Sequence, residues 1–248
     1  NITLKFGGVT AIEDISFDIH EGEIRAIIGP NGAGKSSMLN VISGFYVPQQ
    51  GEVFFRGTKR AQLKPFEVAR QGIARTSQNI ALFEGMSVLD NVMTGRLTHM
   101  KAGIISQSLW RGSAEREETE NREICERVID FLEIQSIRKT PVSRLPYGLK
   151  KRVELARALA SEPKLLLLDE PTASLDPETS IFIREYLKNY QKTNKSTILL
   201  ASHNLNEVES MCKKIIILKS GKISAEGKIS ELLKSKKYSS FEKLFLEN

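Results

Sequence analysis

The feature that most limits the fold of this chain is the stretch GPNGAGKS at residues 29–36, between an apolar run and a helical pattern. It fits the eight-position phosphate-loop template at Gly29, Gly34, Lys35 and Ser36. The glycines let backbone N–H groups turn inward around a phosphate, and the next helix directs its positive end there. Lys35 would supply a cation to the β- and γ-phosphates, and Ser36 a hydroxyl to Mg²⁺. The spacing therefore predicts a strand, a phosphate-binding loop and a helix.

Apolar strand patterns alternate with helical patterns along most of the chain. Runs rich in Ile, Val and Leu occupy residues 23–29, 164–170, 196–202 and 213–219. Apolar strands separated by helices predict an α/β fold with a mostly parallel sheet covered on both faces. A hairpin is expected around Ser220 and Gly221. The alternating stretches ITLKFGG, IEDISFDIH and GEVFFRG predict a small antiparallel β sheet near the N-terminus.

The middle of the chain shows a different pattern. Strand signals are absent from about residue 87 to residue 139, and Ile124, Val128, Phe131 and Leu132 are spaced for one helix face. We therefore expect a helical subdomain at residues 87–149, inserted into a core made of residues 1–86 and 150–248.

Composition limits the class of protein further. The chain has 248 residues, and no apolar run approaches the ~20 residues that cross a bilayer. Cys125 and Cys212 have no metal-ligand spacing, and we expect reduced thiols in a cytosolic protein. The net charge of +6 suits anionic ligands, a nucleic acid or an anionic membrane face, and does not choose among them.

Three polar side chains are expected beside the phosphate loop. Asp169 ends an apolar strand and can reach a bound Mg²⁺, whereas Glu170 points elsewhere, because side chains alternate along a strand, and is placed to activate a water. His203 ends the next strand, where an imidazole could hold the γ-phosphate and the attacking water together. These residues predict nucleotide hydrolysis.

Together these motifs resemble the ATP-binding cassette (ABC) ATPases over almost the whole chain. GPNGAGKSS is similar to the Walker A loop, LLLLDEP to Walker B, ASLD to the D-loop and His203 to the switch histidine. The stretch RTSQNIALFEGMSVLDNVMTGR resembles the Q-loop, with Gln78 as its glutamine. Phe6 stands where the family has an aromatic that stacks on adenine, although a sheet-core phenylalanine would also fit.

The resemblance implies ATP and Mg²⁺ as cofactors of a P-loop NTPase fold. It implies catalysis by Glu170, His203 and Gln78, and a metal held by Ser36, Gln78 and Asp169. The nucleotide contacts that it implies are Phe6, Gly29, Pro30, Asn31, Gly32, Ala33, Gly34, Lys35, Ser36, Ser37, Tyr147, Gly148 and Asp176.

The stretch LPYGL at residues 145–149 takes the place of the family signature, usually LSGGQ. The resemblance implies two subunits arranged head to tail, each directing its signature helix at the γ-phosphate held by its partner. Gly148 and the helix dipole remain, and Pro146 is tolerated at a helix start. The absent serine hydroxyl removes a hydrogen bond worth about 1.5–3 kcal/mol to a charged group. We therefore expect a working signature in a weakened form.

Within this family, the chain most resembles the ATPases of importers for branched-chain amino acids. KFGGVTAIEDISF, PYG and an insertion at residues 96–118 are similar to ATPases of these importers. This implies separate permease subunits, a second ABC ATPase subunit in a heterodimer or homodimer, and indirectly a periplasmic binding protein, with this chain peripheral at the cytoplasmic face of the inner membrane. The ATPase of a lipopolysaccharide exporter is an alternative. A non-transport ABC protein acting on DNA or ribosomes is another, although one cassette without room for long coiled coils predicts no nucleic-acid partner.

Overall fold

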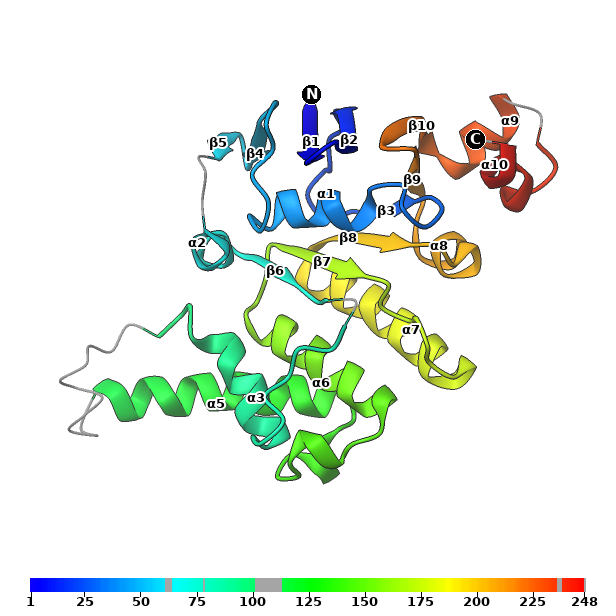
Figure 1. The fold of residues 1–248 in the computed structure, drawn as a ribbon. Helices are drawn as coiled ribbons and strands as arrows, with labels where there is room; N and C mark the ends of the chain where they lie inside the picture. The colour runs from blue at the N-terminus through cyan, green and yellow to red at the C-terminus, as the bar shows by residue number, and fades with distance from the viewer. Residues whose placement is uncertain (61–63, 78, 101–112, 236–237, 248) are drawn as a thin grey trace.

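The computed structural model describes residues 1–60, 64–77, 79–100, 113–235 and 238–247 (Figure 1). Gln78 and residues 101–112 of the segment that resembles an importer insertion lie outside these ranges. The described elements form an α/β fold, as the sequence predicts. Its main sheet has the strand order β10-β9-β3-β8-β7-β6.

The main sheet is parallel except for the hairpin at one edge. Strands β3, β6, β7, β8 and β9 run parallel, while β10 pairs with β9 in the opposite direction. The short strand β6 was not predicted, because its three residues are too few to show a pattern. The strand bounds are β3 (Ile24–Ile28), β6 (Ile73–Arg75), β7 (Leu165–Asp169), β8 (Thr197–Ser202), β9 (Lys214–Lys219) and β10 (Lys222–Lys228).

The central strands are mostly apolar because hydrophobic clusters cover both faces of the sheet. Along β7, Leu166 and Leu168 belong to one cluster, whereas Leu165 and Leu167 belong to the other. Successive side chains point to opposite faces of a strand, so each face needs its own cover. One cluster includes helix α1 (Lys35–Ile42), and the other includes residues of α6 (Tyr147–Ala160), α7 (Pro177–Asn194) and α8 (Leu205–Met211).

The predicted antiparallel strands form two separate pairs. Strand β1 (Ile2–Phe6) pairs with β2 (Val9–Ile15), and β4 (Val53–Phe55) pairs with β5 (Thr58–Arg60). An isolated bridge between Thr3 and Gln50 connects β1 to the segment before β4. The expected strand over IEDISFDIH is too long, because β2 ends at Ile15 after an irregular register with β1.

Helices fill the middle of the chain, as expected from residue 87 onward. Helix α6 packs against α3 (Val88–Met93) and α5 (Ser113–Phe131), and Figure 1 shows all three below the sheet. The guanidinium of the buried Arg96 fixes this arrangement: its Nε donates to Asn121 Oδ1 at 2.7 Å, and its Nη1 donates to the Ala160 carbonyl at 2.7 Å. The short turns here are η1 (Thr94–Arg96), η2 (Gln135–Ile137) and η3 (Val142–Arg144).

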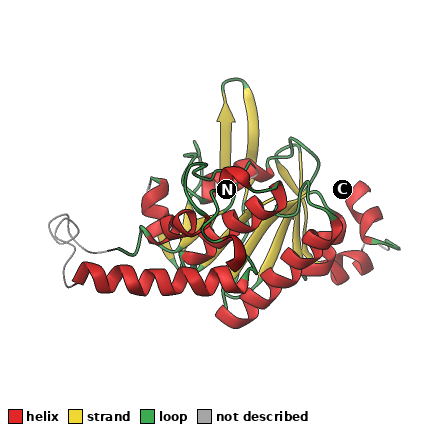
Figure 2. Ribbon diagram, turned by 90° about the horizontal axis from the view of Figure 1, so that it is seen from below, coloured by secondary structure: helices red, strands yellow, loops and turns green. Residues whose placement is uncertain are grey.

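Shorter helices complete the described chain. They are α2 (Pro65–Arg70), α9 (Ile229–Ser235) and α10 (Phe241–Glu247). Figure 2, seen from below, shows helices packed across the strands of the sheet. Among the described helices, none combines the length and apolar character needed to span a bilayer.

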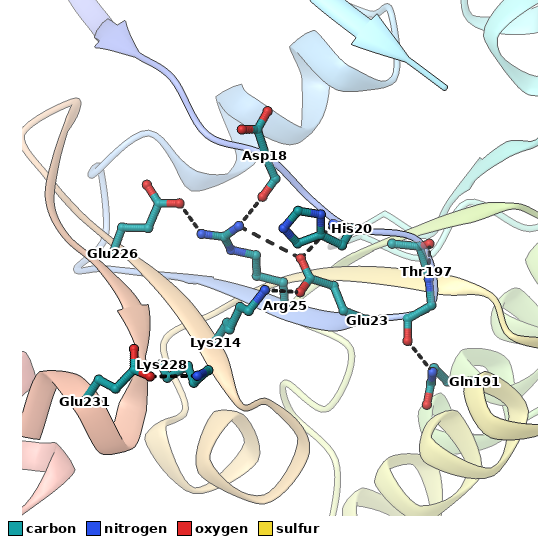
Figure 3. A network of polar contacts seen from close by, with 11 residues as sticks. Asp18, His20, Glu23, Arg25, Gln191, Thr197, Lys214, Glu226, Lys228 and Glu231 are labelled. Atoms are coloured by element: carbon teal, nitrogen blue, oxygen red, sulfur yellow. Dashed lines mark hydrogen bonds and ion pairs between the residues drawn. The ribbon is translucent and has the colours of Figure 1, made fainter. Parts of the chain in front are cut away.

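An ion-pair network ties the amino ends of the core strands together (Figure 3). Arg25 at the start of β3 has a side chain only 5 % exposed, and its guanidinium donates to the Asp18 carbonyl and to Glu226 of β10. Glu23 accepts from Lys214 of β9 at 2.9 Å. Gln191 of α7 donates to the Gly22 carbonyl at 2.6 Å. These contacts link β3, β9, β10 and α7 at the end of the sheet opposite the phosphate loop.

Replacing Arg25 should destabilise the fold more than replacing an exposed ion-pair partner. We expect Arg25→Met to lower the free energy of unfolding by about 3 kcal/mol, the low end for breaking a buried pair, because Glu226 is 34 % exposed. Lys59→Met is the matched control, because its pair with Glu52 is exposed on both sides and should contribute under about 1 kcal/mol. Urea titrations measure both. Equal losses in the two variants would contradict the role given to Arg25.

Candidate functional site

The phosphate loop joins the end of β3 to the start of α1. Gly34 has φ 101° and serves as the N-cap of α1, a backbone conformation that glycine adopts at little cost. A Cβ on Gly34 would lie 2.7 Å from the Ala11 carbonyl oxygen, and one on Gly29 would lie 2.3 Å from the Leu218 carbonyl oxygen. The loop is therefore packed tightly between β2 and β9, and larger residues at these two positions would displace it.

The side chain of Lys35 folds back over its own loop. Its Nζ donates to the Gly29 carbonyl at 2.7 Å and to the Pro30 carbonyl at 3.1 Å. Burial lowers the pKa of Lys35, and the negative charges of Glu170 and Asp169 act in the opposite direction. The ammonium thus lies inside the loop, where a bound phosphate would offer stronger, charged acceptors.

A hydroxyl and a carboxylate meet beside Lys35. Ser36 Oγ, on the first turn of α1, donates to Asp169 Oδ1 at 3.1 Å. Arg75 Nη2 of β6 donates to the other carboxylate oxygen at 3.1 Å, so Asp169 is paired although it is only 2 % exposed. Oxygen donors of this kind suit Mg²⁺, which is commonly bound by one or two protein ligands together with phosphates. The residues present therefore fit such an ion.

Glu170 and His203 form a second polar pair directly after two neighbouring strands. Glu170 has φ +50°, a strained conformation for a residue with a side chain, and its N–H donates to the Ala201 carbonyl at 2.9 Å. Glu170 Oε1 lies 2.7 Å from His203 Nδ1. The carboxylate is 8 % exposed and the imidazole 57 % exposed. The pair can therefore accept a proton from, or orient, a water at the mouth of the site.

Phe6 lies at the end of β1 and is not a core residue. Its side chain is 44 % exposed, and its ring packs edge-to-face with Tyr46, with the two centroids 5.0 Å apart. Part of the ring is therefore exposed to solvent. Of the other predicted contacts in the loop, Pro30, Asn31 and Gly32 are exposed, Ser37 is half-buried and Ala33 is buried.

The predicted signature residues lie at a helix start. Helix α6 begins at Tyr147, which is 44 % exposed, and its N-cap Pro146 provides no side-chain hydrogen bond. Asp176 caps α7 by accepting from the Thr179 N–H at 2.9 Å, which lowers the pKa of Asp176. A Cβ on Gly148 would lie 3.7 Å from the Thr179 side chain, so the starts of α6 and α7 are neighbours. Within the described part of the chain, no hydrogen bond or ion pair joins Tyr147 or Gly148 to residues 29–37.

Two residues near the site were missed by the sequence analysis. Arg75 was missed together with the short strand that carries it. Glu207 of α8 is fully buried and accepts hydrogen bonds from Ser202 and Thr172, yet an acidic residue in a short helix gives no sign of burial.

The fold and the loop define a P-loop NTPase. Comparison with known proteins identifies the family within this class, because the profile of the family described as "ABC transporter" matches residues 12–173. The chain belongs to that family and is an ATPase.

Relatives and a solved structure agree with this assignment. The chain is 30 % identical over 231 residues to the high-affinity branched-chain amino acid transport ATP-binding protein LivG of Salmonella typhimurium, covering 93 % of this chain and 91 % of LivG. It is 32 % identical over 243 residues to a probable LivG of Archaeoglobus fulgidus, covering 96 % and 91 %. A dimeric post-hydrolysis cassette bound to ADP and Pi is 28 % identical with a TM-score of 0.77, covering 92 % and 96 %.

Removing Arg75 should destabilise the protein in a way that a bound cation offsets. Arg75→Met leaves the buried Asp169 carboxylate without its positive partner, which typically costs about 3–5 kcal/mol. We expect this loss in EDTA and a smaller loss with Mg²⁺ and ATP, measured by urea unfolding in both buffers. The exposed Arg138→Met is the control and should change little in either buffer. An equal loss for Arg75→Met in both buffers would contradict the assignment of Asp169 to the cation.

Proposed function

We propose that this chain is the ATP-hydrolysing subunit of an importer for branched-chain or other small hydrophobic amino acids. The two LivG relatives, which are named as ATP-binding proteins of branched-chain amino acid transport and align with more than nine-tenths of this chain, support this substrate class. The observation that carries the hydrolytic part is the Glu170–His203 pair beside the Ser36–Asp169 contact at the mouth of the phosphate loop.

In this proposal separate residues of the chain bind ATP, hold the metal ion and catalyse hydrolysis. Phe6 stacks on the adenine, and the loop N–H groups together with Lys35 hold the phosphates and their developing charge. Ser36, Asp169 and Gln78 would hold Mg²⁺, which supplies further positive charge at the phosphates. Glu170 polarises the attacking water, and His203 holds that water near the γ-phosphate. The products are ADP and phosphate.

The dimer is a second part of the proposal. Two cassettes face each other head to tail, and Tyr147, Gly148 and Asp176 of each contribute to the nucleotide bound by the other. The exposure of Tyr147 and the open start of α6 suit such a contact, and a dimeric relative bound to ADP and Pi supports it. A difference in ATP affinity between open and closed dimers would supply the work of transport.

The remaining partners follow from the transporter class. We propose that residues 87–149 form the helical subdomain that meets separate permease subunits, and that residues 1–86 and 150–248 form the ATP-binding core. The second ATPase subunit would be a different chain or another copy. A periplasmic binding protein would take part indirectly, and the complex would lie at the cytoplasmic face of the inner membrane.

Recovery of the partners from membranes tests the transporter assignment. An affinity-tagged chain, solubilised from its native membranes in mild detergent, should bring down a permease and a second ATPase subunit, identified by mass spectrometry. Uptake of radiolabelled leucine by the reconstituted complex should then require ATP. Recovery with ribosomes or DNA in place of a permease would refute the proposal.

Glu170→Gln should separate binding from hydrolysis. The amide keeps the shape of the side chain but cannot accept the proton, so phosphate release should fall about 10²- to 10⁴-fold while ATP still binds. An ATP-bound dimer should accumulate in size-exclusion chromatography. Glu185→Gln, an exposed change on α7, should leave both measurements unaltered. Near-normal phosphate release by Glu170→Gln would exclude Glu170 as the base.

Pro146→Ser tests the weakened signature. A serine hydroxyl at the start of α6 restores a hydrogen bond of about 1.5–3 kcal/mol to the γ-phosphate bound by the partner subunit. This corresponds to a tenfold to hundredfold rise in the equilibrium constant for dimer closure. We expect higher ATP-dependent dimer affinity or faster turnover, measured by light scattering and phosphate release. If neither quantity changes, the missing hydroxyl has no consequence in this protein.

A further inference from the structure

A buried carboxyl group lies directly behind the Glu170–His203 pair. Glu207, on α8, is fully buried, and its N–H donates to the N-cap side chain of Asn204 at 3.2 Å. Burying an ionised carboxylate is costly unless hydrogen bonds compensate. Helix α8 has seven residues, and its own formation does not require a buried carboxyl group at this position.

The two oxygens of this carboxyl group reach two different segments. Oε2 accepts from Ser202 Oγ at 2.6 Å, at the end of β8 and one residue before His203. Oε1 accepts from Thr172 Oγ1 at 2.8 Å, two residues after Glu170. All three side chains are buried. The carboxyl group therefore bridges the segments that carry the two partners of the Glu170–His203 pair.

The segments that it joins are also tied by backbone pairing, because β7 and β8 pair up to Asp169 and Ala201 and the Glu170 N–H donates to the Ala201 carbonyl at 2.9 Å. His203 is 57 % exposed, and its backbone N–H reaches Glu170 Oε2 only at 3.4 Å. Ser202 Oγ lies 3.5 Å from the same oxygen, too far for a strong bond. The described short contact between Glu170 and His203 is the one between their side chains. Where the backbone pairing ends, the bridge through Thr172, Glu207 and Ser202 is thus a second side-chain tie between the two segments.

Charges near Glu207 come from several elements. Burial raises the pKa of Glu207, Glu170 raises it further, and the two hydroxyls and Arg184 of α7 lower it. Cys212 lies at the far end of α8, and its pKa is raised by burial and by Glu207. Two hydroxyl donors hold this carboxyl group, and among the described residues no ion pair supplies it with a cation.

We propose that Glu207 is a positioning residue for ATP hydrolysis, which bridges the loop after Glu170 to the strand end before His203 and so fixes the distance between these two side chains. The proposal rests on the function proposed above, because it gives Glu207 a part only where Glu170 and His203 act on ATP. Glu207 touches neither of the two side chains through a hydrogen bond of its own. It acts through Thr172 and Ser202.

Substitutions at Thr172 test the bridge with little risk to folding. Thr172→Val keeps the shape but removes the hydroxyl, and turnover should fall about tenfold to a hundredfold, as for a small displacement of a catalytic group. Thr172→Ser keeps the hydroxyl and should retain most of the turnover. ATP affinity, measured by equilibrium binding, should stay the same in both, because the phosphate loop is unchanged. A merely structural hydroxyl would alter thermal stability without this split between turnover and affinity.

Glu207→Gln, compared with the exposed Glu209→Gln on the same helix, provides the second test. We expect reduced turnover with unchanged ATP affinity for Glu207→Gln and no effect for Glu209→Gln. Combining Glu207→Gln with Thr172→Val should add little further loss, because both break the same bridge. Unchanged turnover in Thr172→Val and Glu207→Gln, in a protein that hydrolyses ATP, would overturn this inference alone. A protein with no ATP hydrolysis in any form would overturn the proposed function as well.

Discussion

The register of three parallel strands is the constraint on which the rest of the site depends. In the sheet, Ile28 of β3 pairs with Ser202 of β8, and Asp169 of β7 pairs with Ala201. The residues that follow these strand ends must therefore emerge side by side, although more than 170 positions separate the first segment from the last. Ligands bind at the carboxyl ends of parallel strands for this reason. A shift of one residue in any pairing would turn a carboxylate into the core and an apolar side chain toward the phosphate loop.

Apolar contacts along the strands and the Arg25 network at their amino ends both stabilise this register. Hydrophobic clusters pack against both faces of the strands along their length. The Arg25 network joins their amino ends, far from the phosphate loop. The residues at the carboxyl ends of the strands can therefore be polar ones that do not stabilise the fold. Glu170 illustrates this freedom, because its positive φ is a conformation that costs about 1–3 kcal/mol and persists only where surrounding structure enforces it.

Local patterns in the sequence were sufficient for the parts of the structure that neighbouring residues determine. The phosphate loop, the apolar strands and the helical start at Tyr147 each follow from residues close in the chain. The extent of β2 was not predictable in the same way, because Asp14 takes φ +50° and the register with β1 shifts, which ends the strand before Phe17 despite its alternating pattern. The β6 strand and its Arg75 depend on pairing with β7, a contact across about 90 positions that no local pattern reveals.

The two buried acids beside the site differ in the groups that hold them. Asp169 is neutralised by Arg75 on a neighbouring strand, so its charge is balanced across the sheet. Glu207 has hydroxyl donors instead, and no described hydrogen bond or ion pair gives it a cation. A group held by a cation responds when another cation arrives, whereas a group held by hydroxyls stays where the backbone has placed it. The first arrangement suits the role proposed for Asp169, which would exchange partners when nucleotide and Mg²⁺ bind, and the second suits the positioning role proposed for Glu207.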